Sequence, residues 1–203
     1  MYFDTKLNNH GLAHNPFKAI VAPRPIGWIS SRSASGEANL APYSFFNGVG
    51  SIPPLVMFSS DGVKDSLKNV EETGVFACNF VSRDHTDEMN ATSAPAPRGV
   101  SEFDLAGLEM VVCEKIECDR VKSAYAVLEC KVLQIVNPTD VDGNPTPSHI
   151  VIGQVLGIHV DEAVITDGRF DVAKARPLAR LGYMDYAHVE EKFELLRPDY
   201  PDK

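Results

Sequence analysis

The stretch Asn39-Leu-Ala-Pro-Tyr-Ser-Phe-Phe-Asn47 and the segment before it, Pro23-Arg-Pro-Ile-Gly-Trp-Ile-Ser-Ser31, decide how the chain is interpreted. They flank residues 32–38, where Ser33-Ala-Ser-Gly36 indicates a turn, so we predict that they pair as an antiparallel hairpin. Pro42 has no backbone N–H to donate. It therefore predicts a sheet edge, a bulge, or a place where a group other than backbone approaches the strand.

The second segment carries side chains that suit the edge of a flat ring system with polar groups on its rim. Small residues allow close approach, aromatic residues form a wall, and hydroxyl and amide groups meet ring acceptors. The side chains in question are those of Asn39, Ala41, Tyr43, Ser44, Phe45, Phe46 and Asn47. A half-buried strand with an ordinary proline bulge has the same composition, so composition alone leaves both interpretations open.

Length and composition predict one globular domain. The chain has 203 residues, of which 44% are hydrophobic and 23% are charged, as is ordinary for a soluble protein with a single core. The formal net charge of -9 argues against nucleic acid or an anionic membrane as the main partner, because phosphate binding needs a basic surface. No apolar run approaches the ~20 residues of a membrane span, and the polar N-terminus has no signal-peptide core. We therefore expect a cytoplasmic protein.

The four cysteines have no Cys-x-x-Cys spacing and lie in apolar, strand-like surroundings. They are Cys78, Cys113, Cys118 and Cys130. Buried thiols in a reducing compartment explain this pattern better than a zinc site or a disulfide framework does.

No histidine or acidic pattern predicts a metal site. His10 and His14 have a helical spacing, but the glycine and proline around them disfavour a helix. His149 and His159 lie on one predicted strand and would be roughly 33 Å apart, too far to share a metal. Residues 140–145 begin like a calcium loop but lack its later ligands.

The chain as a whole predicts a mainly β protein with a few short helices. Expected strands cover residues 19–31, 53–59, 74–82, 108–118, 123–137 and 148–160, and expected helices cover 67–73, 84–94 and part of 190–203. Long strands that alternate with turns favour a barrel over a sandwich. No repeat or linker divides the chain, so we expect an N-terminal arm (1–16), a single barrel domain (17–185) and a C-terminal short helix and tail (186–203).

Local signals predict details of two of these elements. Leu67 and Val70 form one apolar stripe of a two-turn helix, and Gly74 is a C-terminal cap signal. Gly153 and Gly157 lie inside the long strand 148–160, where they predict bulges or a close neighbour across the strand.

Residues 61–66 precede the first expected helix and carry a candidate anion site. The backbone N–H groups at a helix N-terminus, the Ser66 hydroxyl and the Lys64 ammonium can converge where the helix dipole is positive. Asp65 or Ser66 can instead simply cap the helix, and the glycine pattern of a Walker loop is absent. Arg24, held between two prolines, can be aimed at a phosphate or carboxylate, or it can be an ordinary surface arginine.

Four blocks in this order resemble the flavin reductase-like family, the FMN-binding split barrels. They are residues 23–31, residues 39–47, Lys64-Asp-Ser66, and Pro177-Leu-Ala-Arg-Leu-Gly-Tyr183. The similarity runs from about Phe17 to about Tyr183. Each block is weak alone, and together they are more specific for FMN binding than for the reaction. The resemblance implies an FMN-binding split β-barrel.

The same resemblance implies which residues hold the cofactor. Lys64, Ser66 and the helix N-terminus would bind the FMN phosphate, aided by Arg24 or Ser31. Residues 30–31 and 39–47 would border the ribityl chain and the isoalloxazine. The complete candidate set is Arg24, Pro25, Ser30, Ser31, Asn39, Ala41, Pro42, Ser44, Phe45, Asn47, Lys64, Asp65, Ser66 and Arg180, with Ala41, Ser44 and Phe45 expected against the ring.

Two positions depart from the family pattern. Ser66 stands where the family often has threonine, which keeps the hydroxyl. Tyr183 replaces the second glycine of a Leu-Gly-Gly block, which leaves the geometry of that loop open.

The implied function is an FMN-dependent oxidoreductase that takes a hydride from NADH or NADPH and passes electrons onward. No protein acid or base is obligatory for hydride transfer, since the cofactor carries the chemistry, and no catalytic residue is assigned. An electron-transfer flavoprotein of the flavoredoxin type and a non-catalytic FMN-binding or storage protein are the alternatives. A β-barrel that binds no flavin is a further one. Family analogy adds a homodimer and a possible oxygenase or electron-transfer partner.

Overall fold

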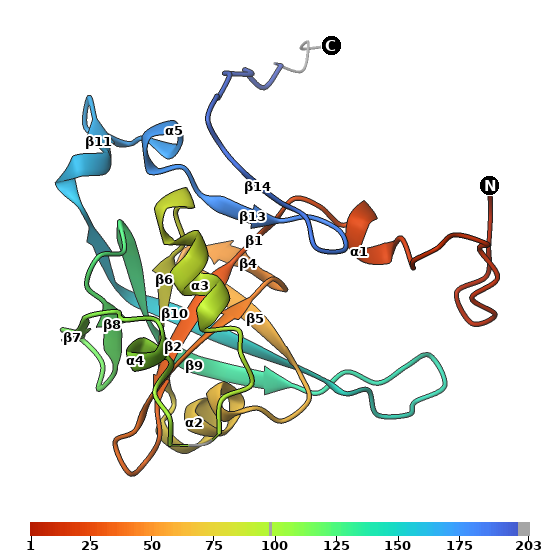
Figure 1. The fold of residues 1–203 in the computed structure, drawn as a ribbon, viewed down its shortest axis with the longest axis horizontal. Coiled ribbons are helices and arrows are strands. Elements are labelled where there is room, and N and C mark those ends of the chain that lie inside the picture. Colours follow the sequence, from red (N-terminus) through yellow and green to blue (C-terminus); the bar gives the residue numbers. More distant parts are fainter. Residues whose placement is uncertain (98, 199–203) are drawn as a thin grey trace, which may run out of the picture.

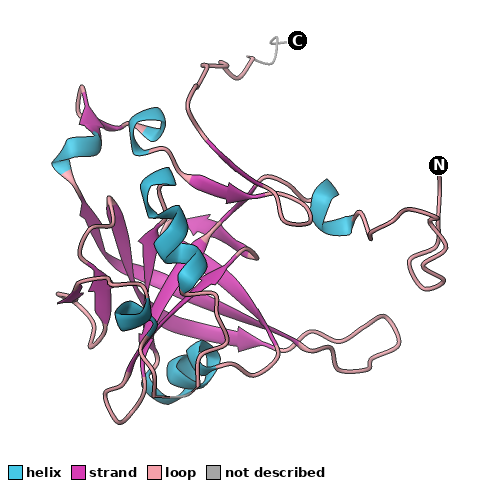
Figure 2. Cartoon of the chain, in the orientation of Figure 1, coloured by secondary structure: helices cyan, strands magenta, loops and turns pink. Residues whose placement is uncertain are grey.

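The computed structural model describes residues 1–97 and 99–198. Seven strands form the main sheet, and every neighbouring pair in it is antiparallel. In sheet order they are β3 (Ala38–Tyr43), β2 (Gly27–Arg32), β6 (Val75–Phe80), β9 (Ala126–Val136), β10 (Ser148–Val160), β5 (Pro54–Asp61) and β4 (Phe46–Ser51) (Figure 1). Strands dominate the chain and short helices lie around the sheet (Figure 2). The mainly β prediction is confirmed.

The connection between β3 and β4 shows that the sheet curls. These strands are the two edges of the sheet, and only Ser44 and Phe45 lie between them. Six strand spacings of ~4.8 Å would separate the edges of a flat sheet by about 29 Å, whereas two linking residues span about 11 Å. The edges are therefore brought together as in an open barrel.

The predicted hairpin of the two opening segments is confirmed, but its second strand is shorter than expected. β2 pairs with β3 from Gly27↔Tyr43 to Arg32↔Ala38. The chain leaves this ladder after Tyr43, and residues from Phe46 onward pair with β5 instead. Residues 39–47 are thus parts of two strands at opposite edges. Pro42 lies on an edge strand, as its missing N–H predicts.

The expected strand 19–31 is wrong in its first half. The chain forms a short helix α1 (Phe17–Ile20), then β1 (Arg24–Pro25), and enters β2 only at Gly27. The two prolines interrupt the ladder because they cannot donate to it. β1 belongs to a separate three-stranded sheet with β13 (Leu178–Arg180) and β14 (Tyr186–His188).

The predicted first helix is confirmed as α2 (Asp65–Thr73), and its apolar stripe is buried through Leu67 and Val70. Gly74 ends it in the left-handed conformation, with φ of 72°, as the cap signal predicts. The helix begins earlier than expected, and no side chain caps its N-terminus. The expected capping by Asp65 or Ser66 is therefore wrong.

Residues 108–118 do not form the long strand that their apolar residues suggest. They give β7 (Met110–Val112), which pairs with β8 (Asp119–Val121) in a separate small hairpin. The helical region after β6 is η1 (Arg83–His85) followed by α3 (Thr86–Ala91), and α4 (Glu102–Leu105) precedes the small hairpin. After β10 come η2 (Glu162–Val164), β11 (Ile165–Thr166), β12 (Arg169–Phe170) and α5 (Val172–Ala175).

The short helix expected within residues 190–203 is absent from residues 190–198, and residues 199–203 lie outside the described part. Phe193, Leu195 and Leu196 are each more than four-fifths exposed. A short helix gains most of its stability from packing an apolar face, and these side chains have nothing to pack against.

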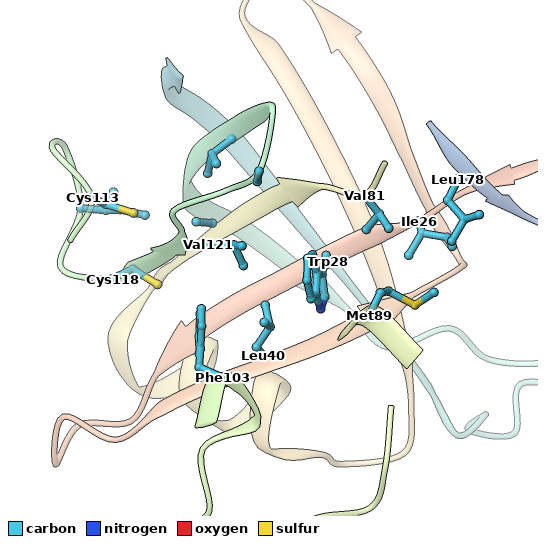
Figure 3. Packing of buried hydrophobic residues seen from close by; sticks show 14 residues of the cluster. Ile26, Trp28, Leu40, Val81, Met89, Phe103, Cys113, Cys118, Val121 and Leu178 are labelled. Atoms are coloured by element: carbon cyan, nitrogen blue, oxygen red, sulfur yellow. The ribbon is translucent and has the colours of Figure 1, made fainter. Parts of the chain in front are cut away.

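Two buried clusters lie on opposite faces of β2, because successive strand residues point to opposite sides. Trp28 belongs to the cluster that also holds Leu40, Phe103 and Val121 (Figure 3). Its neighbour Ile29 belongs to the second cluster.

The predicted irregularities in the long strand β10 are confirmed. The pairing of β10 with β9 shifts register at Gly153 and at Gly157. A Cβ atom on Gly153 would lie 2.5 Å from the Phe76 ring, so the glycine leaves room for this ring in the core.

Candidate functional site

A cavity of about 510 Å³ lies between the edge strand β3, the start of α2 and the segment 92–96. We call it the α2 cavity. Six residues of the sequence-predicted set line it: Asn39, Ala41, Pro42, Lys64, Asp65 and Ser66. Its size is within the ~300–1,000 Å³ range of small-molecule sites. Residues from two distant blocks of the sequence therefore meet at one cavity.

The N-terminus of α2 presents donors to this cavity. Lys64 occupies the N-cap position in an extended conformation, and no side chain caps the first turn. Its ammonium group makes no ion pair with any described residue. Backbone N–H groups of a first turn are unsatisfied unless a cap or ligand meets them, and the helix dipole is positive there. This end of the cavity is suited to an anion.

Two amide–hydroxyl hydrogen bonds attach α2 to the β2–β3 hairpin. Asn39 Nδ2 donates to Ser66 Oγ over 2.9 Å, and Asn69 Nδ2 donates to Ser31 Oγ over 3.2 Å. Ser31 and Asn39 are direct partners in the hairpin, so the amide and hydroxyl roles alternate between the two elements. Because Ser66 Oγ accepts from Asn39, its own proton is free to be donated to a ligand.

Tyr43 gives the cavity a second polar group without a partner. Its hydroxyl is buried and has no hydrogen-bond partner among the described residues, and the residue lines the α2 cavity. Burial raises the pKa of Tyr43, opposed by the nearby hydroxyls of Ser66 and Ser60. An unpaired buried hydroxyl at a cavity wall is costly unless a ligand or water meets it.

Sequence reasoning missed the far wall of the cavity. Residues 92–96 and Glu102 line it, although none of them is in the predicted set. Thr92 is fixed there because its hydroxyl accepts from Trp28 Nε1 over 2.8 Å. The prolines in this loop were a visible signal of a rigid segment, but nothing in the sequence indicated which strand it faces.

Glu102 accepts a backbone N–H of the edge strand β3 and also lines the α2 cavity. Its Oε2 accepts the backbone N–H of Leu40 over 3.0 Å, a donor that an edge strand leaves unpaired. Burial raises the pKa of Glu102, opposed by the Leu40 hydrogen bond.

A second cavity, of about 460 Å³, adjoins the first, since Pro42 and Ser93 line both. We call it the β13 cavity. Of the predicted residues, Arg24, Ser44 and Arg180 line it together with Pro42. The Arg180 guanidinium lies 4.5 Å from the centre of the Tyr186 ring and donates to the Tyr183 carbonyl oxygen. Tyr183 is held with φ of 56°, the conformation that a glycine would favour.

Arg24 lines the β13 cavity, but its guanidinium is largely engaged within the protein. Arg24 is only 6% exposed, and its guanidinium donates to the carbonyl oxygens of Lys18, Val21 and Leu181. Burial and then the charge of Arg180 lower the pKa of Arg24. Its terminal nitrogens donate to the main chain and its Nε has no partner among the described residues, so a role for Arg24 in holding a phosphate stays a prediction.

Ser30 and Ser31 are buried and do not line either cavity. The Ser30 hydroxyl donates to the Asp119 carbonyl oxygen over 2.6 Å. The Ser31 hydroxyl accepts the hydrogen bond from Asn69 Nδ2. The structure thus gives both serines supporting hydrogen bonds, and their contact with a cofactor stays a prediction.

Three further predicted residues also lie outside both cavities. Pro25 lines an apolar groove of about 380 Å³. Phe45 packs beside the cationic groups of Lys18 and Arg24, and Asn47 is exposed, with its side chain bonded to the N–H of Gly48. The break after Tyr43 explains these positions, because it carries Phe45 and Asn47 away from β3.

Within residues 1–97 and 99–198, no three His, Cys, Asp or Glu side chains are grouped so that they could hold a metal ion. In the same residues, no helix has the length and apolar character needed to cross a membrane.

The chain is similar to known proteins in both sequence and structure. A family described as "Flavin reductase like domain" matches residues 21–179. An uncharacterized protein of Aquifex aeolicus is 36% identical over 169 residues, covering 80% of this chain and 83% of its own.

Two solved structures are similar over nearly the whole chain. Nitrilotriacetate monooxygenase component B from Bacillus cereus has a TM-score of 0.83 and 30% identity, covering 92% of this chain and 100% of its own. The 2-nitrobenzoate 2-nitroreductase NbaA of Pseudomonas fluorescens has a TM-score of 0.85 and 25% identity, covering 100% of this chain and 99% of its own.

Proposed function

The chain belongs to the flavin reductase like domain family, and from this premise we propose that it binds FMN in the α2 cavity and reduces it with NADH or NADPH. The proposal follows from the family and from the site together. Family membership and the similar structures support a flavin-binding oxidoreductase; the position of the cofactor and the identity of the reductant are our proposal.

One observation supports this position for FMN: an uncapped helix N-terminus lies together with Lys64 and Ser66 at one end of the α2 cavity. A phosphate with two negative charges needs cations and N–H or O–H donors. Lys64 supplies the cation, and Ser66 supplies a hydroxyl whose lone pair is already engaged by Asn39. The residues present therefore fit the phosphate of FMN.

The rest of the α2 cavity fits the remainder of the molecule. Ala41 is small and Pro42 has no N–H, so a flat ring can approach the edge strand β3 closely there. The unpaired Tyr43 hydroxyl and the Glu102 carboxyl add polar groups to the walls. Segment 92–96 would cover the bound group from the side opposite β3.

Bound FMN would supply hydride acceptance and onward electron transfer, which no side chain of the protein can provide. The β13 cavity is our candidate for the nicotinamide nucleotide, because it adjoins the α2 cavity through Pro42 and Ser93. Arg180 and Lys18 line it and would attract the phosphates of the nucleotide. The protein's task is then to hold two rings next to each other.

The electron acceptor is proposed by likeness. The name of the Bacillus cereus protein makes it one component of a monooxygenase, so we propose that this chain likewise passes electrons to a partner oxygenase or electron carrier. The name of the Pseudomonas fluorescens protein adds a nitroaromatic acid as a second acceptor to test.

A homodimer in the cytoplasm completes the proposal. Leu156, Ile158 and Val160 alternate along β10 and are 43–60% exposed, an apolar row that a second copy could cover. A monomer at micromolar concentration in sedimentation would refute the dimer and leave flavin binding untouched.

The test is the visible absorption spectrum of purified protein after incubation with FMN, desalting and anaerobic addition of NADH or NADPH. We expect retained flavin colour that a nicotinamide nucleotide bleaches. Retained colour that neither nucleotide bleaches would overturn the reductase and favour the electron carrier or store. No retained colour and no reduction of free flavin would overturn the proposal entirely.

A further inference from the structure

The four free cysteines form two pairs of neighbours. Cys113 and Cys118 flank the tip of the β7–β8 hairpin, whereas Cys78 and Cys130 lie on the adjacent strands β6 and β9. Burial and then the Cys130 thiol raise the pKa of Cys78, and the Cys118 thiol raises the pKa of Cys113, so both pairs are close in space. All four are at most 7% exposed. The two pairs differ in whether their members lie directly opposite or diagonal to each other on the paired strands.

Cys113 and Cys118 stand directly opposite each other. The last ladder pair of the hairpin is Val112↔Asp119, and one further step brings the two cysteines together. The backbone N–H of Cys113 donates to the Cys118 carbonyl oxygen over 2.9 Å, whereas the Cys118 N–H donates to the Ile116 carbonyl oxygen, so one of the two ladder bonds of this pair is made. In a hydrogen-bonded antiparallel pair the Cα atoms are ~5.5 Å apart, inside the ~4.4–6.8 Å range of disulfides.

Cys78 and Cys130 do not have this relationship. Cys78 is opposite Leu128, and Cys130 is opposite Phe76, so the two cysteines are diagonal neighbours. Diagonal neighbours are ~7–8 Å apart, and Cα atoms more than ~7 Å apart cannot be bridged without backbone movement. Cys78 and Cys130 therefore serve as an internal control for the Cys113–Cys118 pair.

The hairpin tip is held in place from two sides. Glu129 is fully buried and accepts the backbone N–H groups of Glu114 and Lys115 at 2.8 and 2.6 Å. On the other side, Asp119 accepts from Arg32 over 2.5 Å and, through its carbonyl oxygen, from Ser30. Both cysteines lie on the β7–β8 side of the buried cluster (Figure 3). They are therefore held opposite each other before any bond forms.

One member of the pair borders a groove that small reagents can enter. Cys118 lines a groove of about 810 Å³ between the β2–β3 turn, the end of α2 and the hairpin tip. A hydrogen bond from the Cys113 thiol lowers the pKa of Cys118, which favours the thiolate that reacts with oxidants. Cys78 has the opposite tendency, since burial raises its pKa.

We propose that Cys113 and Cys118 are a reversible dithiol–disulfide pair that is oxidised by a peroxide. The Cys118 thiolate attacks one oxygen of hydrogen peroxide and the O–O bond breaks; the leaving hydroxide takes up the proton that the thiol had released, so that Cys118 sulfenic acid and one water result. The Cys113 sulfur then attacks the sulfenic sulfur, the S–S bond forms, the S–O bond breaks, and a second water leaves. Two thiol hydrogens and two electrons pass to one peroxide, and a thiol reductant reverses the change.

The test treats the folded, full-length protein with hydrogen peroxide, removes the peroxide, and alkylates the remaining thiols after unfolding. We expect the intact mass to fall by two hydrogens and two thiols to stay alkylatable. Trypsin cleaves after Lys115, between the cysteines, so the disulfide is detected as two linked peptides. Cys78 and Cys130 should be alkylated in full, and dithiothreitol should restore all four thiols.

Cys113→Ser removes the resolving thiol, and we expect its Cys118 to be trapped as sulfenic acid by dimedone. The proposal is overturned if Cys113 and Cys118 both remain alkylatable, or if they gain oxygen without becoming linked. It is equally overturned if Cys78 and Cys130 become linked at the same rate. Because the main readout uses the wild-type chain, a variant that fails to fold does not weaken the test.

Discussion

Asn39 Nδ2 donates a hydrogen bond to Ser66 Oγ over 2.9 Å, which joins the edge strand β3 to the first turn of α2. A matching bond runs from Asn69 of α2 to Ser31 of the neighbouring strand β2. Both bonds attach the helix, but only Asn39 and Ser66 line the α2 cavity. The pair therefore connects the fold of the hairpin to the proposed phosphate site.

This difference predicts distinct effects of two similar substitutions. Asn39→Ala should weaken FMN binding about 5- to 10-fold, because Ser66 loses the partner that orients its hydroxyl, a bond of roughly 1 kcal/mol. Asn69→Ala should lower the free energy of unfolding by about 1 kcal/mol and leave FMN affinity nearly unchanged. Fluorescence titration with FMN and urea denaturation measure the two effects. Equal losses of FMN affinity in both variants would contradict the assignment of Ser66.

The close approach at Gly153 predicts a stability defect. A Cβ atom there would lie 2.5 Å from the Phe76 ring, so Gly153→Ala should lower the free energy of unfolding by about 1–3 kcal/mol through overpacking. Gly48→Ala is the matched control, since its nearest neighbour would be Leu55 O at 3.9 Å. We expect the control to stay within about 0.5 kcal/mol of the wild type. Similar midpoints in urea for both variants would show that β10 is packed differently.

The environment of Glu129 predicts that the free energy of unfolding depends on pH. Burial raises the pKa of Glu129, but the N–H groups of Glu114 and Lys115 and the His159 side chain lower it more strongly, so the net pKa is below its ordinary value. The unfolded state then binds more protons than the folded state near pH 4, and stability falls as the pH falls through the folded pKa. Above the unfolded pKa the stabilisation is complete.

Glu129→Gln should remove this part of the acid dependence and lower stability at neutral pH by about 1–3 kcal/mol, since buried donors lose a charged acceptor. Urea denaturation from pH 3 to pH 7 measures both effects. A variant whose stability changes with pH in parallel with the wild type would contradict the assignment.

The backbone conformation of Tyr183 predicts which side chains are tolerated at this position. With φ of 56°, the residue is in a region that Gly and Asn enter readily and β-branched residues avoid. Tyr183→Asn and Tyr183→Val both lose the ring contact with His14, so their difference isolates the backbone. We expect the valine variant to be less stable than the asparagine variant by about 1–2 kcal/mol in thermal unfolding. Equal stabilities would mean that the loop adopts another conformation.

The sequence predicted those features that depend on neighbouring residues. The β2–β3 hairpin followed from its turn and strand residues, the end of α2 from Gly74, and the edge position of β3 from Pro42. Gly153 likewise marked a close contact, although Phe76 could not be identified as its partner. In each case a backbone property of one or two residues limits the structure locally.

The features that the sequence did not predict depend on distant partners. Arg24 has a stiff backbone as expected, but one of its acceptors is the carbonyl of Leu181, which no local pattern indicates. Ser30 and Ser31 carry suitable hydroxyls, yet the helix and the small hairpin use both of them. Glu102 was missed because its role depends on a hydrogen bond with the N–H of Leu40, a residue 62 positions away on the edge strand β3.

The phosphate assignment at the start of α2 is tested most directly by comparing FMN with riboflavin, which lacks the phosphate. The wild type should bind FMN at least about 100-fold more tightly, and replacing Lys64 and Ser66 together by Ala should reduce this ratio about 10- to 100-fold, as expected for lost charged hydrogen bonds. Riboflavin affinity should change little, and Lys131→Ala, which removes a distant lysine, should keep the wild-type ratio. A wild type that binds both flavins equally, or a double variant that keeps the full preference for FMN, would contradict the proposed site.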